Sequence, residues 1–581
     1  MADIQNRIET LLQDAVGAAL GEEHRETDPI VRPSGNPKFG DYQANLAMGL
    51  AKKLGQKPRD LAQQIAAKLP GNALLESAEV AGPGFINLRL TREALDAHAA
   101  AMLASDRLGL EPAGEPETVV VDYSGPNVAK EMHVGHLRST VLGDAIARVL
   151  ELQGHAVVRQ NHLGDWGTQF GMLIQYLLDT GWEAEGEPEI GNLNRLYQQA
   201  KQKLDADPDF AKRARERVVA LQSGDDETTS VWQGLVEESK RHFNAVYRRL
   251  GVDLRDADIR PESFYNDRLP GVIGGLEQAG LLAESEGAAV VYPEGFQDRE
   301  GEPMPMIVRK TDGGYLYATT DLAAARFRIG ELGASRLIYV TDARQSQHFA
   351  MVFQTLRQAG WADAGVRLDH VPFGAVLGPD RRPFKTREGG TVRLVELVDE
   401  AESRAAGVIR EKNPDLPEAE QERIASAVGI GALKYADLSS DRIKDYVFDW
   451  NRMLAMDGNT APYLQNAYVR IRSIFRKGKI DAESLDAGAI RAEAPAERAL
   501  VLKLLQWPGV IASVADSLEP HRLCNWLYEL ATGYHQFYER CPVLTAEEAS
   551  VRQSRLALSH LVARALQEGL GLLGIEVVER M

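Results

Sequence analysis

Cysteine and long hydrophobic runs are scarce in this sequence, and each shortage excludes a class of protein. Cys524 and Cys541 are the only cysteines among 581 residues, which excludes a disulfide framework and a zinc site built from thiolates. No apolar run approaches the ~18 residues that a membrane span requires. The first twenty residues scatter acidic side chains among apolar ones, unlike a signal or transit peptide. We therefore expect a multidomain cytoplasmic protein with no membrane contact.

Positive charge is also in short supply, but its distribution leaves room for a nucleic-acid partner. A net charge of −18 would by itself disfavour binding to a polyanion. From Ala461 onward, however, 14 basic side chains balance 14 acidic ones, so the first 460 residues carry the whole deficit. The run Arg470–Lys479 holds five cations in ten residues, a pattern more typical of a solvated helix end than of a phosphate contact. Charge alone does not identify the partner.

Shifts in composition divide the chain into three predicted domains. Residues 1–112 combine two helical patterns with a glycine-flanked strand pattern, which predicts a small α+β domain. Residues 116–454 alternate strand and helix patterns, interrupted at about 173–260 by a charged helical stretch that we interpret as an insertion. Residues 455–581 are almost entirely helical in pattern and predict an all-α bundle.

The second predicted domain begins with the pattern of a βαβ unit. Thr118–Ser124 is an apolar, β-branched run, a helix pattern extends from about Val134 to Leu152, and residues 156–161 have a second strand pattern. Nearly continuous hydrophobic strands are typical of a buried parallel sheet. Strand patterns return further on, and we expect them to complete a doubly wound, Rossmann-type α/β sheet. They are AAVVYP, MIVRK, RLIYVTD and VPFGAVLG.

The loop after the first of these strands carries the pattern HxGH. It would lie at the carboxyl end of a parallel strand and open a helix, where free N–H groups and the helix dipole favour phosphate. His133 and His136 are three residues apart and so project from one side of the first turn. Gly135 would let a flat base lie against the backbone. A GxGxxG fingerprint is absent from this loop, which disfavours NAD and FAD.

Several sequence blocks, in a fixed order, resemble the arginyl-tRNA synthetase family of the class I aminoacyl-tRNA synthetases. The HxGH pattern resembles the HIGH motif of the class, and its flanks narrow the match to the arginyl family. The resemblance covers essentially the whole chain and implies ATP-dependent attachment of L-arginine to tRNA through arginyl-adenylate. It also implies that tRNA must be bound before arginine is activated. The blocks are DYSGPNVAKEMHVGHLRST, HLGDWGTQFG, DGGYLYATTDLAAARFR, TDARQSQHF and GNTAPYLQ.

The resemblance implies catalytic roles in two phosphate loops. His133, His136 and Lys130 would stabilise charge on the phosphoryl oxygens, with Mg²⁺ carried on the ATP. The second loop of the class, KMSKS, is matched here only by Lys385 and Thr386, because its second lysine is replaced. Many arginyl enzymes with that departure have a lysine just upstream of HIGH, at the place of Lys130; taken alone, Lys130 would be a solvated loop charge. The implied ATP contacts are Gly135, His133, His136, Lys385, Thr386 and His348.

The resemblance also implies a pocket for arginine. Tyr317 and Asp321 are four residues apart at the start of a predicted helix and so share a face. The matching family positions hold the guanidinium and its stem. Asn127 would hold the amino or carboxylate end, and Glu262 and Gln345 match further arginine contacts. The alternative for Asp321 is a helix cap.

For tRNA, the resemblance implies contacts near both ends of the chain. The loop at residues 33–45 resembles the part of the amino-terminal domain that meets the outer corner of tRNA; an ordinary helix-capping loop is the alternative. The terminal bundle would meet the anticodon, although Asn466 stands where family members often carry an aromatic residue. The implied contacts are Asn36, Phe39, Gln43, Tyr463, Gln465 and Tyr468.

Two other functions fit parts of the pattern. One is another nucleotidyl transferase with an HxGH site, which the tRNA-type terminal bundle disfavours. The other is a non-catalytic tRNA-binding paralogue, which the presence of His133, His136, Lys385 and Asp321 disfavours. We expect a monomer whose partners are tRNA, L-arginine and ATP, with no zinc or other metal bound by the protein.

Overall fold

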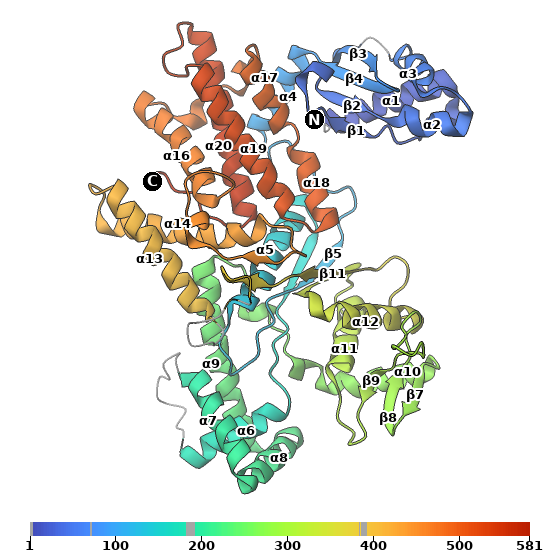
Figure 1. Cartoon of the computed structure of the whole chain (residues 1–581), viewed down its shortest axis with the longest axis vertical. Coiled ribbons are helices and arrows are strands. Elements are labelled where there is room, and N and C mark those ends of the chain that lie inside the picture. The colour runs from blue at the N-terminus through green and yellow to red at the C-terminus, as the bar shows by residue number, and fades with distance from the viewer. Residues whose placement is uncertain (1–3, 70–71, 182–191, 383, 385–391) are drawn as a thin grey trace.

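The amino-terminal domain packs three helices against a small antiparallel sheet. The computed structural model describes residues 4–69, 72–181, 192–382, 384 and 392–581 (Figure 1). Strands run in the order β1 (Val31–Pro33), β2 (Tyr42–Ala44), β4 (Phe85–Leu90), β3 (Leu75–Ala81). Helix α1 buries one stripe against them, because its apolar residues recur at helical spacing. The helices are α1 (Ile4–Leu20), α2 (Leu46–Leu54) and α3 (Pro58–Ala66).

The central domain is built on a parallel sheet of the predicted Rossmann type. Its described strands run in the order β11 (Arg367–Phe373), β10 (Arg336–Asp342), β5 (Thr118–Asp122), β6 (Ala156–Gln160), and every neighbouring pair is parallel. Successive residues of β5 enter two different cores, one shared with α5 and the other with α11 and α12. Helices therefore cover both faces of the sheet, and the predicted fold class is confirmed. These helices are α5 (Val134–Gln153), α11 (Tyr317–Gly330) and α12 (Ser346–Gln358).

Two predicted strands do not join that sheet. The AAVVYP and MIVRK segments form β8 (Ala288–Val291) and β9 (Met306–Arg309), which lie with β7 (Leu282–Ser285) in a separate antiparallel sheet. The turn between β7 and β8 accounts for the antiparallel pairing of these two strands. Its residues Glu286 and Gly287 both have positive φ, at 53° and 79°. That geometry forms a tight hairpin turn, whereas neighbouring parallel strands need a long crossover. The expectation that these strands extend the Rossmann sheet was wrong.

Within the described residues, four α-helices fall in or overlap the charged stretch that we interpreted as an insertion, and they gather at the lower end of the molecule in Figure 1. Asp207 caps the third of them and Asp225 the fourth, each accepting hydrogen bonds from backbone N–H groups of the first turn. The fourth helix is the longest and runs back toward the central sheet. They are α6 (Thr168–Thr180), α7 (Asn192–Ala206), α8 (Pro208–Ser223) and α9 (Asp226–Leu250).

Helices α13 (Leu394–Lys412) and α14 (Glu418–Leu438) lead from the central domain to a terminal bundle. In the described part of the chain, one stretch, Pro495–Ser517, is long and apolar enough for a membrane span by composition, contrary to the expectation that none exists. It consists of two helices, broken near Pro508, whose apolar side chains pack inside the bundle. The bundle comprises α16 (Ala461–Gly478), α17 (Pro495–Leu504), α18 (Trp507–Ser517), α19 (His521–Arg540) and α20 (Ala549–Leu572).

A buried ion pair joins α5 to α14, and its contribution to stability can be tested. The Nε of Arg138 lies 3.1 Å from Asp437, and both side chains are at most 1% exposed. The guanidinium also donates to the carbonyls of Gly374 and Lys444, at 2.8 and 3.2 Å. Removal of one partner strands the other charge in an apolar interior, which is far costlier than loss of a solvated pair.

We expect Arg138→Met to destabilise the protein by roughly 3–5 kcal/mol, because Asp437 would be left buried and unpaired. The measurement is the first unfolding transition of the full chain in urea or on heating. Arg423→Met is the matched control, since its pair with Glu576 is more than half exposed on both sides. Equal, small shifts for the two variants would contradict the assigned role of the buried pair.

Candidate active site

The HxGH pattern forms a helix cap made by its two histidines. His133 is the N-cap residue of α5, and its Nδ1 accepts a hydrogen bond from the backbone N–H of Gly135 at 3.0 Å. The Nδ1 of His136 accepts from the backbone N–H of His133, also at 3.0 Å. The two ring centroids are 4.0 Å apart. The pair therefore forms a capping box, in which each ring satisfies a backbone donor of the first turn.

This cap determines which nitrogen can meet a ligand. Since both Nδ1 atoms accept, a neutral ring carries its proton on Nε2, which becomes a donor. Burial and the neighbouring His133 lower the pKa of His136 to about 3, while burial and the charge of Lys130 lower the pKa of His133. Both rings are therefore neutral at pH 7, and each has an N–H that can donate to a ligand.

Gly135 has a steric role that differs from the predicted one. A Cβ at this position would come 2.8 Å from the Cε1 of His133 and 3.0 Å from its Nδ1. Real Cβ atoms do not approach a ring this closely, so a side chain would push His133 out of its cap. Glycine is thus required by the histidine pair itself, and contact of Gly135 with ATP stays a prediction.

Side chains of helix α9 hydrogen-bond to the HxGH loop and the residues before it, a feature that the sequence did not reveal. Ser239 accepts from the backbone N–H of Ala129 at 2.9 Å. The hydroxyl of Tyr247 lies 2.8 Å from that of Ser124 and accepts from the amide of Asn161 at 3.0 Å. Ser239 and Tyr247 belong to no recognisable sequence motif. They occupy ordinary helical positions and contact the HxGH loop only because the insertion folds back on the sheet. The loop is therefore held by distant residues.

The segment that follows the predicted second phosphate loop adjoins the HxGH cap. Lys385 and Thr386 lie outside the described residues, so their predicted roles are not compared with the structure. The segment just after them pairs with the cap: the N–H of Val134 donates to the carbonyl of Val392, and that of Leu394 donates to the carbonyl of Met132. Arg393 reaches Glu131 at 3.1 Å. The carboxyl end of this loop is thus attached beside His133.

Acidic side chains converge beside this edge of the sheet. Asp165 follows β6 and is 1% exposed; it accepts from both the backbone N–H and the hydroxyl of Ser263, at 2.9 and 2.6 Å. That contact fixes the start of the short helix η4 (Glu262–Arg268). Burial, together with the charges of Asp165 and Asp321, raises the pKa of Glu262 to about 7. Such an arrangement is poised to receive a cation.

Asp321, Tyr317 and His348 form a second group next to Glu262. The Nε2 of His348 lies 2.6 Å from Asp321, and the rings of His348 and Tyr317 meet edge to face at 4.9 Å. Tyr317 is 65% exposed and open to a ligand. The N-cap of α11 is Leu316, so Asp321 stands inside the helix and the alternative of a cap is excluded. The structure thus places His348, a predicted ATP contact, with the predicted arginine residues.

The remaining predicted arginine residues stand on the same side of the sheet. Asn127 follows β5, is exposed, and forms a backbone bridge with Gly164 next to Asp165. Gln345 is an exposed N-cap residue of α12, after β10. The predicted pocket residues therefore come from two kinds of segment. Some segments directly follow the carboxyl ends of parallel strands, and the others pack against those ends. Among the described residues, no group of His, Cys, Asp or Glu is arranged to hold a metal ion.

Comparison with known proteins agrees with this geometry across the whole chain. Residues 98–450 match the family of class I tRNA synthetases (R), catalytic domain, residues 464–581 the DALR anticodon binding domain, and residues 4–90 the arginyl tRNA synthetase N-terminal domain. An arginine–tRNA ligase of Thermobifida fusca (strain YX) is 52% identical over 582 residues, covering 100% of both chains. The chain belongs to the arginyl-tRNA synthetase family.

Other family members give the same picture. The arginine–tRNA ligase of Escherichia coli (strain K12) is 50% identical over 576 residues, covering 99% of this chain and 100% of its own. The arginyl-tRNA synthetase structure from Plasmodium falciparum has a TM-score of 0.86 at 31% identity, with both chains fully covered. That from Thermus thermophilus has a TM-score of 0.83 at 27% identity, covering 99% of this chain and 100% of its own.

The structure shows which side chains predicted to bind tRNA face solvent. Phe39 is 49% exposed, at the tip of its loop. Asn36 caps a short 3₁₀ helix by accepting from the N–H of Lys38, and Gln43 donates to Asn87 at 2.8 Å. Tyr463 is half-buried, with its hydroxyl 3.0 Å from the Nδ1 of His535. Contact of these four with tRNA remains a prediction.

Two predicted tRNA contacts are corrected. Gln465 is fully buried and donates to the carbonyls of Ala427 and Glu576, at 3.1 and 2.7 Å. Tyr468 is 4% exposed, and its hydroxyl donates to Glu579. Neither can present its polar edge or ring face to a base in this structure, so direct contact was the wrong expectation for both. They hold the carboxyl-terminal tail against α16 instead.

The double role of His133 yields a prediction. Asparagine is a strong N-cap residue, so His133→Asn should keep the helix start but remove the Nε2 donor. We expect unchanged thermal stability and a loss of about 10²–10³-fold in ATP–pyrophosphate exchange, assayed with arginine and tRNA. His133→Ala should lose stability as well as activity. An active His133→Asn enzyme would mean that the ring serves the helix alone.

Proposed function

We propose that the protein attaches L-arginine to its cognate tRNA through arginyl-adenylate, with ATP as substrate and Mg²⁺ carried on the ATP. The observation that carries this proposal is a juxtaposition at one edge of the sheet. Two neutral Nε2 donors stand at the start of α5, and the carboxylates of Glu262 and Asp321 gather beside the loops after β5 and β6. Donors suit a triphosphate, and carboxylates suit a guanidinium.

In the first step, a carboxylate oxygen of arginine attacks the α-phosphorus of ATP. The bond to the bridging oxygen breaks, and pyrophosphate leaves. His133 and His136 donate to the oxygens on which charge builds, and Lys130 lies in the same loop; Mg²⁺ would neutralise the pyrophosphate. In the second step, a ribose hydroxyl of the terminal adenosine attacks the arginyl carbonyl, and AMP leaves. Neither step requires a protein nucleophile.

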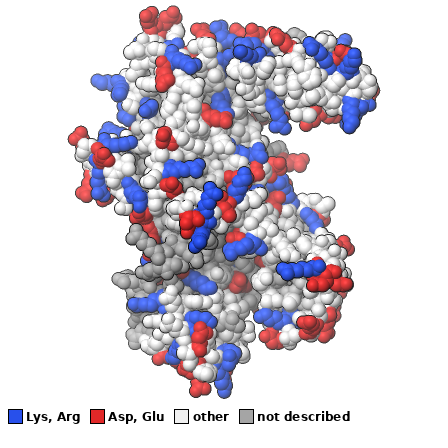
Figure 2. All heavy atoms as spheres, viewed as in Figure 1, with Lys and Arg blue, Asp and Glu red and all other residues white. Residues whose placement is uncertain are grey.

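Transfer RNA would span the molecule from the amino-terminal domain to the bundle. The outline in Figure 2 is indented below the projecting amino-terminal domain, and the visible face mixes Lys and Arg with Asp and Glu without one positive field. In α16, Arg472 and Arg476 are paired with Glu579. Phe39 and Tyr463 remain the proposed stacking contacts, together with Asn36 and Gln43.

The proposed active form is a cytoplasmic monomer. One chain supplies candidates for the arginine, ATP and tRNA contacts, so no second copy is needed to complete the site. Both cysteines are free and buried, which suits a reducing compartment.

Aminoacylation of total tRNA with each amino acid in turn tests the proposal. Incorporation of arginine alone supports it. Exchange of ATP with pyrophosphate, with and without tRNA, separates a synthetase from a non-catalytic tRNA-binding paralogue. Adenylate formation with another carboxylic acid and no charging of tRNA would indicate a different HxGH transferase.

The raised pKa of Glu262 predicts a pH dependence. Glu262 meets a guanidinium only as a carboxylate, and with a pKa of about 7 its ionised fraction rises from about a tenth at pH 6 to nine-tenths at pH 8. We expect kcat/KM for arginine to rise several-fold over this range, while kcat/KM for ATP changes less. Glu262→Gln should lower kcat/KM and flatten the rise. An equal slope in wild type and variant would assign the titration to another group.

Asp321 provides a test of guanidinium recognition. Asp321→Asn keeps the size of the side chain and removes its charge; loss of one partner from a buried charged pair costs roughly 2–5 kcal/mol. We expect kcat/KM for arginine to fall by about 30-fold or more, with KM for ATP little changed. Unchanged arginine kinetics would leave recognition to Glu262 and Gln345.

A further inference from the structure

Lys130, the proposed cation of the HxGH loop, is held by a side chain from the helical insertion. Its Nζ lies over the ring of Tyr197, 5.1 Å from the centroid, and Tyr197 stands in the first half of α7. This distance is within the range of a favourable cation–π contact. The HxGH loop and the insertion therefore meet at Lys130 itself.

Among the described residues, no carboxylate lies within ion-pair distance of Lys130. The adjacent Glu131 is paired with Arg393 at 3.1 Å instead. The charge of Lys130 nonetheless reaches the cap, because it helps to lower the pKa of His133. An aromatic face attracts an ammonium without neutralising it. The ring can thus orient Lys130 and leave its charge free for phosphate.

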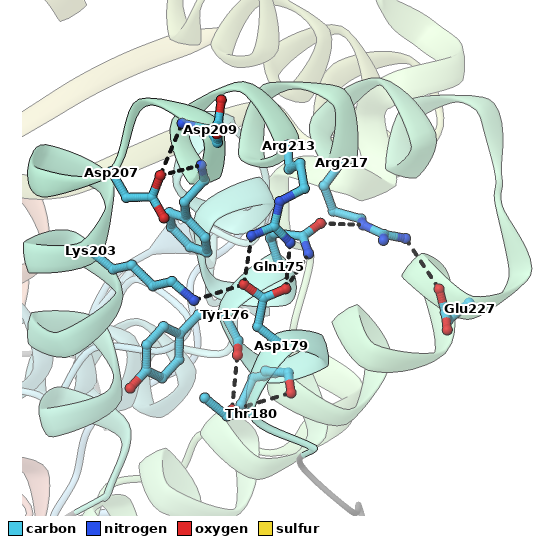
Figure 3. Close-up of polar contacts among 12 residues, drawn as sticks. Gln175, Tyr176, Asp179, Thr180, Lys203, Asp207, Asp209, Arg213, Arg217 and Glu227 are labelled. Atoms are coloured by element: carbon cyan, nitrogen blue, oxygen red, sulfur yellow. Dashed lines mark hydrogen bonds and ion pairs between the residues drawn. The ribbon is translucent and has the colours of Figure 1, made fainter.

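The helix that carries Tyr197 is itself fixed in place. Asp179, at the end of α6, accepts from Lys203 of α7 at 2.8 Å and from the Nη1 and Nη2 of Arg213 of α8, as Figure 3 shows. These partners hold the pKa of Asp179 far below its usual range. Lys203 also lies over the rings of Tyr176 and Phe210, at 5.7 and 4.8 Å.

Tyr197 and Lys203 point in different directions. Six residues at about 100° each place them about 120° apart around the helix. Lys203 contacts Asp179 of α6 and Phe210 of α8, whereas Tyr197 meets Lys130 of the HxGH loop and also lines a cavity with residues of α6 and α8. Tyr197 therefore lies between the anchored helices and the catalytic loop.

We propose that Tyr197 is a positioning residue for adenylate formation, whose ring face orients the Lys130 ammonium for the phosphates of ATP. The inference rests on the proposed function and adds a residue that neither contacts arginine nor belongs to the HxGH motif. It also gives the insertion a catalytic purpose, because an insertion held by Asp179 presents the ring at a constant place.

The experiment measures ATP–pyrophosphate exchange with arginine and tRNA for Tyr197→Leu and Tyr197→Phe. Leucine removes the π face and keeps apolar bulk, whereas phenylalanine keeps the face. We expect Tyr197→Leu to lower kcat by about three- to tenfold, the range of a partly buried cation–π contact, with KM for arginine and tRNA unchanged within about twofold. Tyr197→Phe should retain at least about half of wild-type kcat.

A double-mutant cycle isolates the contact. In a Lys130→Ala background, which should itself be slow, Tyr197→Leu should cause no further loss. Trp361→Leu is the control, because it removes a cation–π pair, with Arg326 at 4.3 Å, that lies outside both the insertion and the HxGH loop; its exchange rate should stay within about twofold of wild type. The melting temperature of each variant confirms that it is folded.

Four outcomes would overturn the inference. They are unchanged or increased kcat in Tyr197→Leu, an equal loss in Tyr197→Phe, a further loss in the Lys130→Ala background, and an equal loss in Trp361→Leu. An inactive wild-type enzyme with arginine and tRNA would instead reject the proposed function, so the two failures are distinguishable.

Discussion

The helix that begins with the histidine cap is buried along most of its length, and the charges that it buries must be matched inside the protein. Fourteen of the twenty residues of α5 are buried, including Arg138 and Asp144. Arg138 is satisfied by Asp437 and by the carbonyls of Gly374 and Lys444. Gly374 follows β11, just before the second phosphate loop. Burial of this one guanidinium therefore ties the helix of the HxGH motif to the end of β11 and to α14.

Asp144 extends the same constraint to the other domains. It lies 2.8 Å from Arg148 and near the buried amine of Lys434, which donates to the carbonyls of Leu250 and Gly574 at 2.8 and 2.7 Å. Gly574 has a φ of +64°, and a Cβ there would lie 2.3 Å from the Lys434 Nζ, so only glycine allows this approach. The end of α9, helix α14 and the carboxyl-terminal tail therefore meet at the catalytic helix. Burial lowers the pKa of Lys434 to about 8.

Local signals determined what could be predicted from the sequence. The helix at Ile4–Leu20, the strand at Thr118–Asp122 and the HxGH helix follow from periodicity and composition over a few residues, and the structure shows all three. Strands β8 and β9 were assigned to the wrong sheet, because an apolar run indicates a strand but does not show which strand it pairs with. Gln465 was misjudged for a similar reason: its burial depends on a tail more than a hundred residues later. Tyr197 is an ordinary helical tyrosine until the insertion folds against the loop.

In the proposed arginine site, the arrangement of the acidic side chains would explain how one cation is preferred over another of equal charge. Asp165 is held by Ser263, Glu262 by the short helix that this contact fixes, and Asp321 by His348. Each carboxylate is thus restrained by its own segment, and the group cannot contract around a compact ammonium. A guanidinium spreads its donors over a planar fork and can reach acceptors that stay apart. Lysine would satisfy one acceptor and leave the others buried without a partner, a cost that can reject an analogue by ~10⁴-fold. Selectivity for arginine then depends on the rigidity of the segments that keep the negative charges separated, more than on the total charge of the pocket.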